Sequence, residues 1–183
     1  ARRKEPLMRV YRLQRNQVLA ATLQTAWDFF SDPRNLARIT PPWLGFTITS
    51  ATPPMTPGLI LTYTVTPLFG LRRTWVSEIT HVQPPHSFVD EQRFGPYRFW
   101  HHLHRFHQLD GQVAVEDVVH YALPFGLPGQ FVHRRLVRPR LEAIFDYRRE
   151  ALKALFPAPD SGTGRRTDSP PVRTAAVSRP AVT

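Results

Sequence analysis

Four of the eight histidines in this sequence fall within seven residues, in the stretch His101-His102-Leu103-His104-Arg105-Phe106-His107. Neighbouring side chains of an extended strand point to opposite faces, so His102 and His104 share one face and His101 and His107 the other. Imidazole exchanges protons near neutral pH and is a common metal ligand. The stretch is therefore compatible with three roles: acid–base catalysis, orientation of a ligand, and metal binding.

A turn just downstream predicts which carboxylate meets these histidines. Asp110-Gly111 separates two alternating segments, and this dipeptide favours a two-residue hairpin turn that fixes the register of both strands. In that register His104 lies opposite Asp117, and Trp100 lies opposite Tyr121. The hairpin is thus expected to bring one histidine and one aspartate directly together.

The two faces of this predicted hairpin differ in polarity. Arg105 and Glu116 pair on one face, as expected for an ion pair on the solvent side. The opposite face is rich in aromatic residues and valines, and we expect it to point inward. Its side chains include Trp100, His102, His104, Phe106, Asp117 and Tyr121.

A carboxylate inside an apolar sheet needs a partner, and the sequence leaves three roles open for the His104–Asp117 pair. The pair could fix the strand register, orient a ligand, or act as a general acid and base. No nucleophile is evident nearby, so the sequence favours a binding protein over an enzyme. If the chain is an enzyme, we predict His104, Asp117 and Tyr121 as its catalytic residues, with Tyr63 as the other candidate proton donor.

A metal site is the remaining interpretation of the histidine stretch. His102, His104 and Asp117 could form a two-histidine, one-carboxylate set. Only the spacing supports this set, since His101 and His107 face away. We therefore predict no metal and no cofactor.

Large aromatic residues on the other segments could line a cavity with the hairpin. Each of them is by itself explained by core packing, but so many in a small sheet can leave space for a ligand. Whether the interior is an open cavity or a filled core is left open by the sequence. The predicted ligand-binding residues are Tyr63, Trp75, Trp100, His102, His104, Phe106, Asp117 and Tyr121.

The elements that position these residues follow from the periodicity. A strand is expected from Arg9 to Leu19, then a short helix capped by Thr22 and a second short helix from Asp32-Pro33 through Ile39. The period then changes to two, which predicts strands over 46–50, 59–66, 72–82, 87–94, 97–109 and 112–122. The Gly95-Pro96 turn allows two registers, one placing Glu91 beside Trp100 and the other placing Asp90 and Gln92 there.

A long amphipathic helix is expected from Pro128 to Phe156, and Pro139 should kink or split it. Its predicted apolar stripe consists of Phe131, Leu141, Ile144, Phe145, Leu152 and Leu155. Consecutive hairpins give an antiparallel sheet, and this helix is the one element able to cover its concave face. The predicted fold is α+β: a curved antiparallel sheet of about seven strands wrapped around the C-terminal helix.

Composition limits the partners and the location. The net charge is +10, but the basic residues are scattered arginines with only Lys4 and Lys153 as lysines, so we predict no specific nucleic-acid partner. We expect a solvated helix face, with a possible weak contact with an anionic membrane surface, from Arg134, Arg135, Arg138, Arg140, Arg148 and Arg149. Cysteine is absent and no apolar run is long enough to span a bilayer, which predicts a cytoplasmic protein.

The ends of the chain differ from its middle. Residues 157–183 are mostly Pro, Ser, Thr, Ala and Arg without an apolar period, which predicts a disordered tail, and residues 1–8 are expected to be disordered as well. One domain is therefore predicted over residues 9–156.

A family pattern is carried by Ala26-Trp27-Asp28-Phe29-Phe30-Ser31-Asp32-Pro33-Arg34-Asn35-Leu36, Ile39-Thr40-Pro41-Pro42-Trp43, Pro84-Pro85-His86-Ser87-Phe88-Val89-Asp90-Glu91-Gln92, Gly95-Pro96-Tyr97-Arg98-Phe99-Trp100-His101-His102-Leu103-His104-Arg105-Phe106 and Tyr121-Ala122-Leu123-Pro124-Phe125-Gly126. In these stretches the domain resembles the START-related, polyketide cyclase-like (SRPBCC) superfamily, and in particular its bacterial ligand-binding members. The resemblance extends over residues 8–156, ending in the helix with Ile144-Phe145-Asp146-Tyr147-Arg148.

The resemblance implies a helix-grip fold with a hydrophobic cavity between the sheet and the C-terminal helix. It implies binding or carrying of a small hydrophobic molecule, such as a lipid, a quinone or a polyketide. The alternative is a polyketide cyclase or dehydratase that uses the interior His–Asp pair, since members of one fold differ in activity.

Overall fold

The computed structural model describes residues 9–67, 70–124 and 131–158. Both predicted terminal segments lie outside these residues, apart from residues 157 and 158. The described chain forms a seven-stranded antiparallel sheet of order β1-β7-β6-β5-β4-β3-β2. The strands are β1 (Tyr11–Leu19), β2 (Thr47–Ile48), β3 (Ile60–Val65), β4 (Arg73–Gln83), β5 (Ser87–Phe94), β6 (Phe99–Leu109) and β7 (Gln112–Ala122). The predicted α+β fold is confirmed.

Short helices connect β1 to the rest of the sheet, as predicted. Helix α1 (Leu23–Phe30) begins at Thr22, whose side chain accepts a hydrogen bond from the Thr25 amide. The 3₁₀ helix η1 (Pro33–Ile39) begins at Asp32 and has proline in its first turn. A further 3₁₀ turn, η2 (Pro42–Leu44), follows η1.

The β6–β7 hairpin has the register that Asp110-Gly111 predicts. Leu109 pairs with Gln112, His104 with Asp117, and Trp100 with Tyr121. On the outer face, Arg105 Nη1 lies 3.2 Å from Glu116 Oε2, which confirms the expected ion pair.

The preceding hairpin resolves the register that the sequence left open. Asp90 pairs with His102 and Glu91 with His101, so Asp90 lies on the inward face with His102 and His104. The side chain of Gln92 holds the connecting loop, because it hydrogen-bonds both the carbonyl and the amide of Tyr97.

The last helix begins differently from the prediction. A π-helical segment, η3 (His133–Val137), precedes α3 (Arg138–Leu155), and residues 128–130 of the predicted helix lie outside the described residues. Pro139 is the second residue of α3 and has no amide hydrogen to donate, so the expected disruption takes the form of this π-helical segment. The prediction that Phe131 belongs to the buried stripe is wrong, because its side chain is exposed beyond the packed part of the helix.

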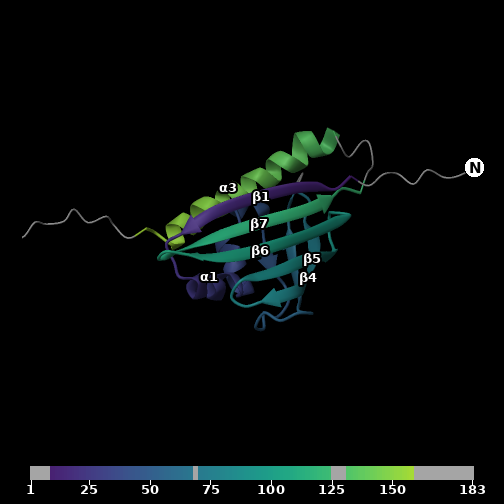
Figure 1. Cartoon of the computed structure of the whole chain (residues 1–183). Helices are drawn as coiled ribbons and strands as arrows, with labels where there is room; N and C mark the ends of the chain where they lie inside the picture. The colour runs from purple at the N-terminus through teal and green to yellow at the C-terminus, as the bar shows by residue number, and fades with distance from the viewer. Residues whose placement is uncertain (1–8, 68–69, 125–130, 159–183) are drawn as a thin grey trace, which may run out of the picture.

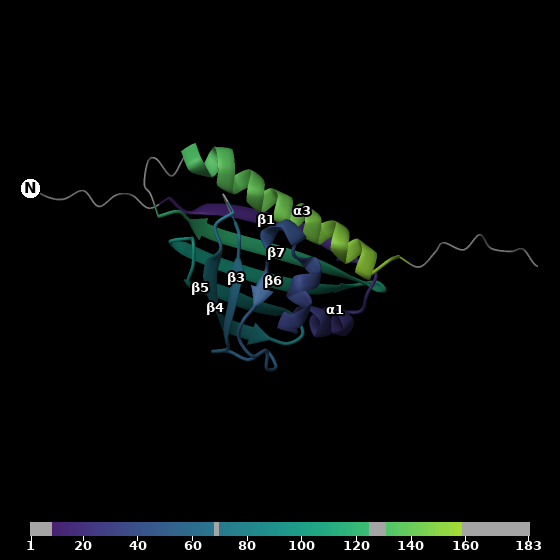
Figure 2. The same ribbon diagram turned by 180° about the vertical axis from the view of Figure 1, so that it is seen from behind.

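The α3 helix runs along one face of the sheet. Helix α1 lies close to the C-terminal end of α3 in both views (Figures 1 and 2). The interior between them contains two apolar clusters. One surrounds Trp27, Phe106 and Leu152, and the other surrounds Trp100 and Phe145.

A polar layer lies between these two clusters. Along β6, His102 and His104 fall between Trp100 of one cluster and Phe106 of the other. Asp117 has the same intermediate position on β7, and Arg148 has it on α3. The fold thus brings charged side chains from separate elements to one level of the core.

Candidate functional site

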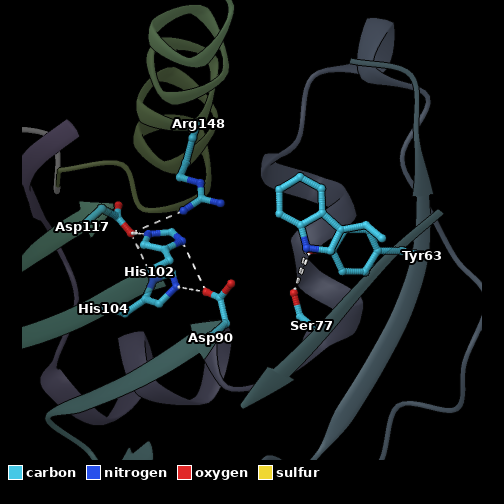
Figure 3. Close-up of polar contacts among 8 residues, drawn as sticks. Tyr63, Ser77, Asp90, His102, His104, Asp117 and Arg148 are labelled. Atoms are coloured by element: carbon cyan, nitrogen blue, oxygen red, sulfur yellow. Dashed lines mark hydrogen bonds and ion pairs between the residues drawn. The ribbon is translucent and has the colours of Figure 1, made fainter. Parts of the chain in front are cut away.

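Two histidines lie between two carboxylates in this polar layer (Figure 3). His102 Nε2 is 2.9 Å from Asp117 Oδ1, and His104 Nε2 is 3.0 Å from Asp90 Oδ2, and both pairs are hydrogen-bonded. Each histidine also approaches the other carboxylate, at 3.3 Å from His102 Nδ1 to Asp90 and 3.0 Å from His104 Nδ1 to Asp117. The predicted His104–Asp117 neighbours are therefore part of a four-membered cluster.

Burial and charge act in opposite directions on this cluster. Burial alone would lower the pKa of His102, but the charges and hydrogen bonds of Asp90 and Asp117 outweigh it and raise that pKa above its usual value. Burial would likewise raise the pKa of Asp117, but His102, His104 and Arg148 hold it well below the usual range. The site therefore contains buried carboxylates and a histidine that favours its charged form.

Arg148 enters this site from α3 and corrects the sequence interpretation. The series of arginines in this helix predicted a solvated face that included Arg148, yet its side chain is only 10% exposed. Its Nη1 lies 3.4 Å from Asp117 Oδ1, and the guanidinium carbon lies 5.0 Å from the centre of the Phe145 ring. A buried positive charge therefore borders the cluster.

A cavity of about 170 Å³ adjoins the cluster, lined by residues of the sheet, α1, η1 and α3. Most of its lining is aromatic or aliphatic, and Asp90, His102, His104 and Arg148 form a polar patch in the wall. We call these four side chains the polar patch. The cavity lies between the sheet and the last helix, as the resemblance implied.

The predicted ligand-binding residues divide into two groups. Those that line the cavity are Tyr63, Trp75, Trp100, His102 and His104. The other three, Phe106, Asp117 and Tyr121, are buried as predicted but are not among the lining residues. Phe106 packs against Trp27 and Phe30, and Asp117 lies behind the histidines.

Tyr121 points to a different part of the core. Its hydroxyl hydrogen-bonds His133 Nε2 at 2.8 Å, and the His133 ring stacks on Tyr11 with centroids 3.6 Å apart. Burial raises the pKa of Tyr121 to about 12. Tyr121 therefore connects β7 to η3 and does not reach the cavity as a proton donor.

A second polar group, outside the polar patch, also lines the cavity. Ser77 Oγ accepts a hydrogen bond from Trp75 Nε1 at 3.0 Å and lies 3.0 Å from the Tyr63 hydroxyl. Burial and the charge of Asp90 raise the pKa of Tyr63 far above its usual value. Tyr63, which lies beside Ser77 in Figure 3, is thus a neutral hydroxyl among the lining residues.

The same cluster contains donor atoms that suit a metal ion. Asp90, His102 and His104 each offer one ligand atom within 4.8 Å of the others. Nitrogen and carboxylate donors in this combination fit divalent transition metals. The sequence interpretation had grouped Asp117 with the histidines, whereas the structure groups Asp90 with them and places Asp117 on their far side.

Sequence reasoning missed three polar residues of the site. Asp90 was left between two registers, and the turn residues do not reveal the contact of Gln92 with Tyr97 that accompanies the observed register. Arg148 occurs in a run of arginines that is typical of a solvent-facing surface, and Ser77 carries no signal beyond its inward position in the alternating pattern of β4.

Comparison with protein families agrees with this fold. Residues 19–145 match the family described as polyketide cyclase / dehydrase and lipid transport. The chain belongs to this family. It is thereby a member of the SRPBCC superfamily, as the sequence resemblance predicted. No curated protein sequence matches the chain.

Solved structures share the fold of this family member at low sequence identity. The aromatase/cyclase Zhui from Streptomyces sp. R1128 is 16% identical, with a TM-score of 0.64, over 80% of this chain and 93% of that one. The protein Ms6760 from Mycobacterium smegmatis is 24% identical, with a TM-score of 0.55, over 79% and 92%. Norcoclaurine synthase from Thalictrum flavum is 14% identical, with a TM-score of 0.57, over 81% and 97%.

The helices of this family member do not meet the requirements of a membrane span. Among residues 9–67, 70–124 and 131–158, none is both long and apolar enough to cross a bilayer.

Proposed function

We propose that this family member binds and carries a small, mainly hydrophobic molecule in the cavity between the sheet and α3. The observation that supports the proposal is an apolar cavity whose wall contains one concentrated polar patch. Ligand sites combine an apolar lining with a few convergent polar groups in this way. The apolar lining would supply affinity, and the polar patch would orient the ligand.

The cavity volume indicates the size of the ligand portion that it can enclose. An apolar cavity of about 150 Å³ in another protein accommodates benzene. A cavity of about 170 Å³ therefore suits a molecule of one ring or a short branched chain. A larger polycyclic or long-chain ligand would extend beyond this space.

Binding can be tested by thermal unfolding and by tryptophan fluorescence, since Trp75 and Trp100 line the cavity. We expect a panel of one-ring and two-ring aromatic compounds to raise the melting temperature and to quench the fluorescence. Ile144→Trp, which fills the cavity from α3, should abolish both effects. Tyr147→Trp, at a site 38% exposed on the same helix, should preserve them. Absence of stabilisation by every compound would contradict the proposal.

A second candidate function is that of a cyclase or dehydratase. One observation favours it: His104 lines the cavity and is hydrogen-bonded to Asp90, which gives a base with an orienting carboxylate. Of the two proposed tyrosine donors, only Tyr63 lines the cavity. If His104→Gln leaves the turnover of a polyketide-like substrate unchanged while the variant stays folded, this function is excluded.

We also propose a weak contact with anionic membrane surfaces, made by the start of the last helix. Phe131, Val132 and Leu136 are exposed there, next to the exposed Arg134 and Arg135. Exposed apolar side chains beside cations are typical of interfacial binding. Such a contact would bring the carrier to a source or a destination of a hydrophobic ligand.

A further inference from the structure

Arg148 has far fewer partners than a buried guanidinium requires. Its side chain is only 10% exposed, and among the described residues its one polar partner is Asp117, at 3.4 Å. Its Nε is buried without any hydrogen bond. A guanidinium has five N–H donors, so most of the Arg148 donors have no hydrogen-bond partner among the described residues.

The partner that Arg148 does have is already engaged. Asp117 Oδ1 also lies 2.9 Å from His102 Nε2 and 3.0 Å from His104 Nδ1. The contact with Arg148 is the longest of the three, and its length is at the outer limit of a hydrogen bond. Asp117 therefore compensates the histidines first and Arg148 only weakly.

The unused side of Arg148 borders the cavity. Arg148 is a lining residue together with Tyr63 and Ser77, which lie across the space from it. Figure 3 shows one guanidinium nitrogen directed to Asp117 and the other directed into this space. The carboxylate of the polar patch, Asp90, is already compensated by His102 and His104.

We propose that Arg148 binds a carboxylate of the ligand, so that the natural ligand is a small aromatic or branched-chain carboxylic acid. This inference rests on the proposed binding function and specifies its ligand class. A planar guanidinium fork matches the two oxygens of a carboxylate, and such charge-assisted pairs are stronger than neutral hydrogen bonds. The ring or chain of the acid then occupies the apolar part of the cavity, towards Tyr63 and Trp75.

Matched ligand series test the inference. The one-ring series is benzoate, benzamide and toluene, and the two-ring series is 2-naphthoate, 2-naphthamide and 2-methylnaphthalene. Within each series the shape is nearly constant, whereas the group that meets Arg148 changes from anion to amide to methyl. Calorimetric titration of the full chain should show that the acid binds about ten-fold or more tightly than its amide.

Variants of two neighbouring arginines complete the test. Arg148→Met should remove the preference for the acid and leave the hydrocarbon affinity nearly unchanged, and Arg148→Lys should keep part of the preference because it keeps the charge. Arg149→Met, at a position 49% exposed on the same helix, should keep all of it. Circular dichroism and thermal unfolding establish that each variant is folded, and Arg148→Lys still tests the carboxylate fork if Arg148→Met is unfolded.

The possible outcomes separate the two proposals. Equal binding of acid, amide and hydrocarbon by the wild type overturns the carboxylate inference and leaves the binding function in place. The carboxylate inference is also overturned if Arg148→Lys and Arg148→Met both keep the full acid preference. Failure of all six compounds to bind overturns the proposed function and the inference together.

Discussion

His102 is the residue on which the charge balance of the core depends. It touches Asp117 on β7 and Asp90 on β5, with His104 beside it and Arg148 approaching from α3. Removing one partner of a buried charged pair usually destabilises a protein by about 3–5 kcal/mol, because the other charge stays buried and unpaired. The polar layer is therefore expected to be sensitive to single substitutions and to pH.

We predict that the stability cost of His102→Asn is larger at pH 6 than at pH 9. The pKa of His102 is raised above its usual value of 6.5. Its contribution to stability is thus fully present below about pH 6.5 and is lost as the pH rises through the folded-state pKa. Urea unfolding of the wild type and the variant at both pH values measures the difference, and an equal cost at both would contradict the raised pKa.

His133 provides a control, because its pKa is shifted in the opposite direction from that of His102. Burial lowers the pKa of His133, which lies in η3 against Tyr11 and Tyr121. Its contribution is present above about pH 6.5 and is lost as the pH falls, so the cost of His133→Asn should be larger at pH 9 than at pH 6. Because the two histidines act in opposite directions, only the differences between each variant and the wild type are informative.

At the scale of elements, the β6–β7 hairpin holds two of the three strands that contribute to the polar layer. Gly111 in its turn has a φ of 65°, a left-handed conformation that side chains with a Cβ disfavour. No atom lies within 4 Å of the position that a Cβ would occupy there, so a substitution acts through backbone conformation alone. Substitutions of Gly111 therefore test how strongly the turn conformation contributes to the register of β6 and β7.

We predict that Gly111→Ala destabilises the protein by about 1 kcal/mol, the usual cost of a left-handed conformation for an L-residue. Gly111→Asn should cost less, because asparagine tolerates this conformation. Chemical denaturation of the three proteins provides the measurement. Equal stability of the alanine and asparagine variants would show that the turn does not impose its conformation on the register.

The same hairpin shows what could be predicted from the sequence and what could not. Asp110-Gly111 restricts the turn to one local geometry, and the whole register of β6 and β7 follows from it. Gly95-Pro96 allows two registers, and in the observed one Gln92 contacts Tyr97 across the loop. The turn residues alone were thus sufficient for one hairpin, whereas the register of the other is accompanied by a side-chain contact within its loop.

The position of Arg148 was unpredictable for a related reason. The periodicity of α3 shows a stripe formed by Leu141, Phe145 and Leu152, and Arg148 continues that stripe at the helical spacing. Arginine side chains are mostly exposed in proteins, so the residue type predicted exposure where the helical spacing predicted burial. Its contact with the carboxylate of Asp117, on a strand 31 residues earlier, cannot be predicted from the helix alone.

At the scale of the whole molecule, the two proposed binding surfaces lie in different regions. The cavity lies between the sheet and α3, whereas the exposed apolar side chains Phe131, Val132 and Leu136 are at the start of the last helix. Arg135 lies with its guanidinium carbon 5.8 Å from the Phe131 ring centre. The net charge of +10 would attract the whole molecule to any anionic surface. Only additional apolar contacts would direct the binding to the start of the last helix.

We predict that the full chain binds vesicles of phosphatidylcholine with 30 mol% phosphatidylserine more tightly than vesicles of pure phosphatidylcholine. Each cation near an anionic surface contributes about 1 kcal/mol, so binding should weaken steeply with salt. Phe131→Ser and the pair Arg134→Glu with Arg135→Glu should each reduce co-sedimentation. Phe94→Ser, a substitution at another exposed phenylalanine, and Arg149→Glu, at the other end of the helix, should have smaller effects. If all four variants lose binding equally, the attraction is a property of the total charge and the helix start has no special role.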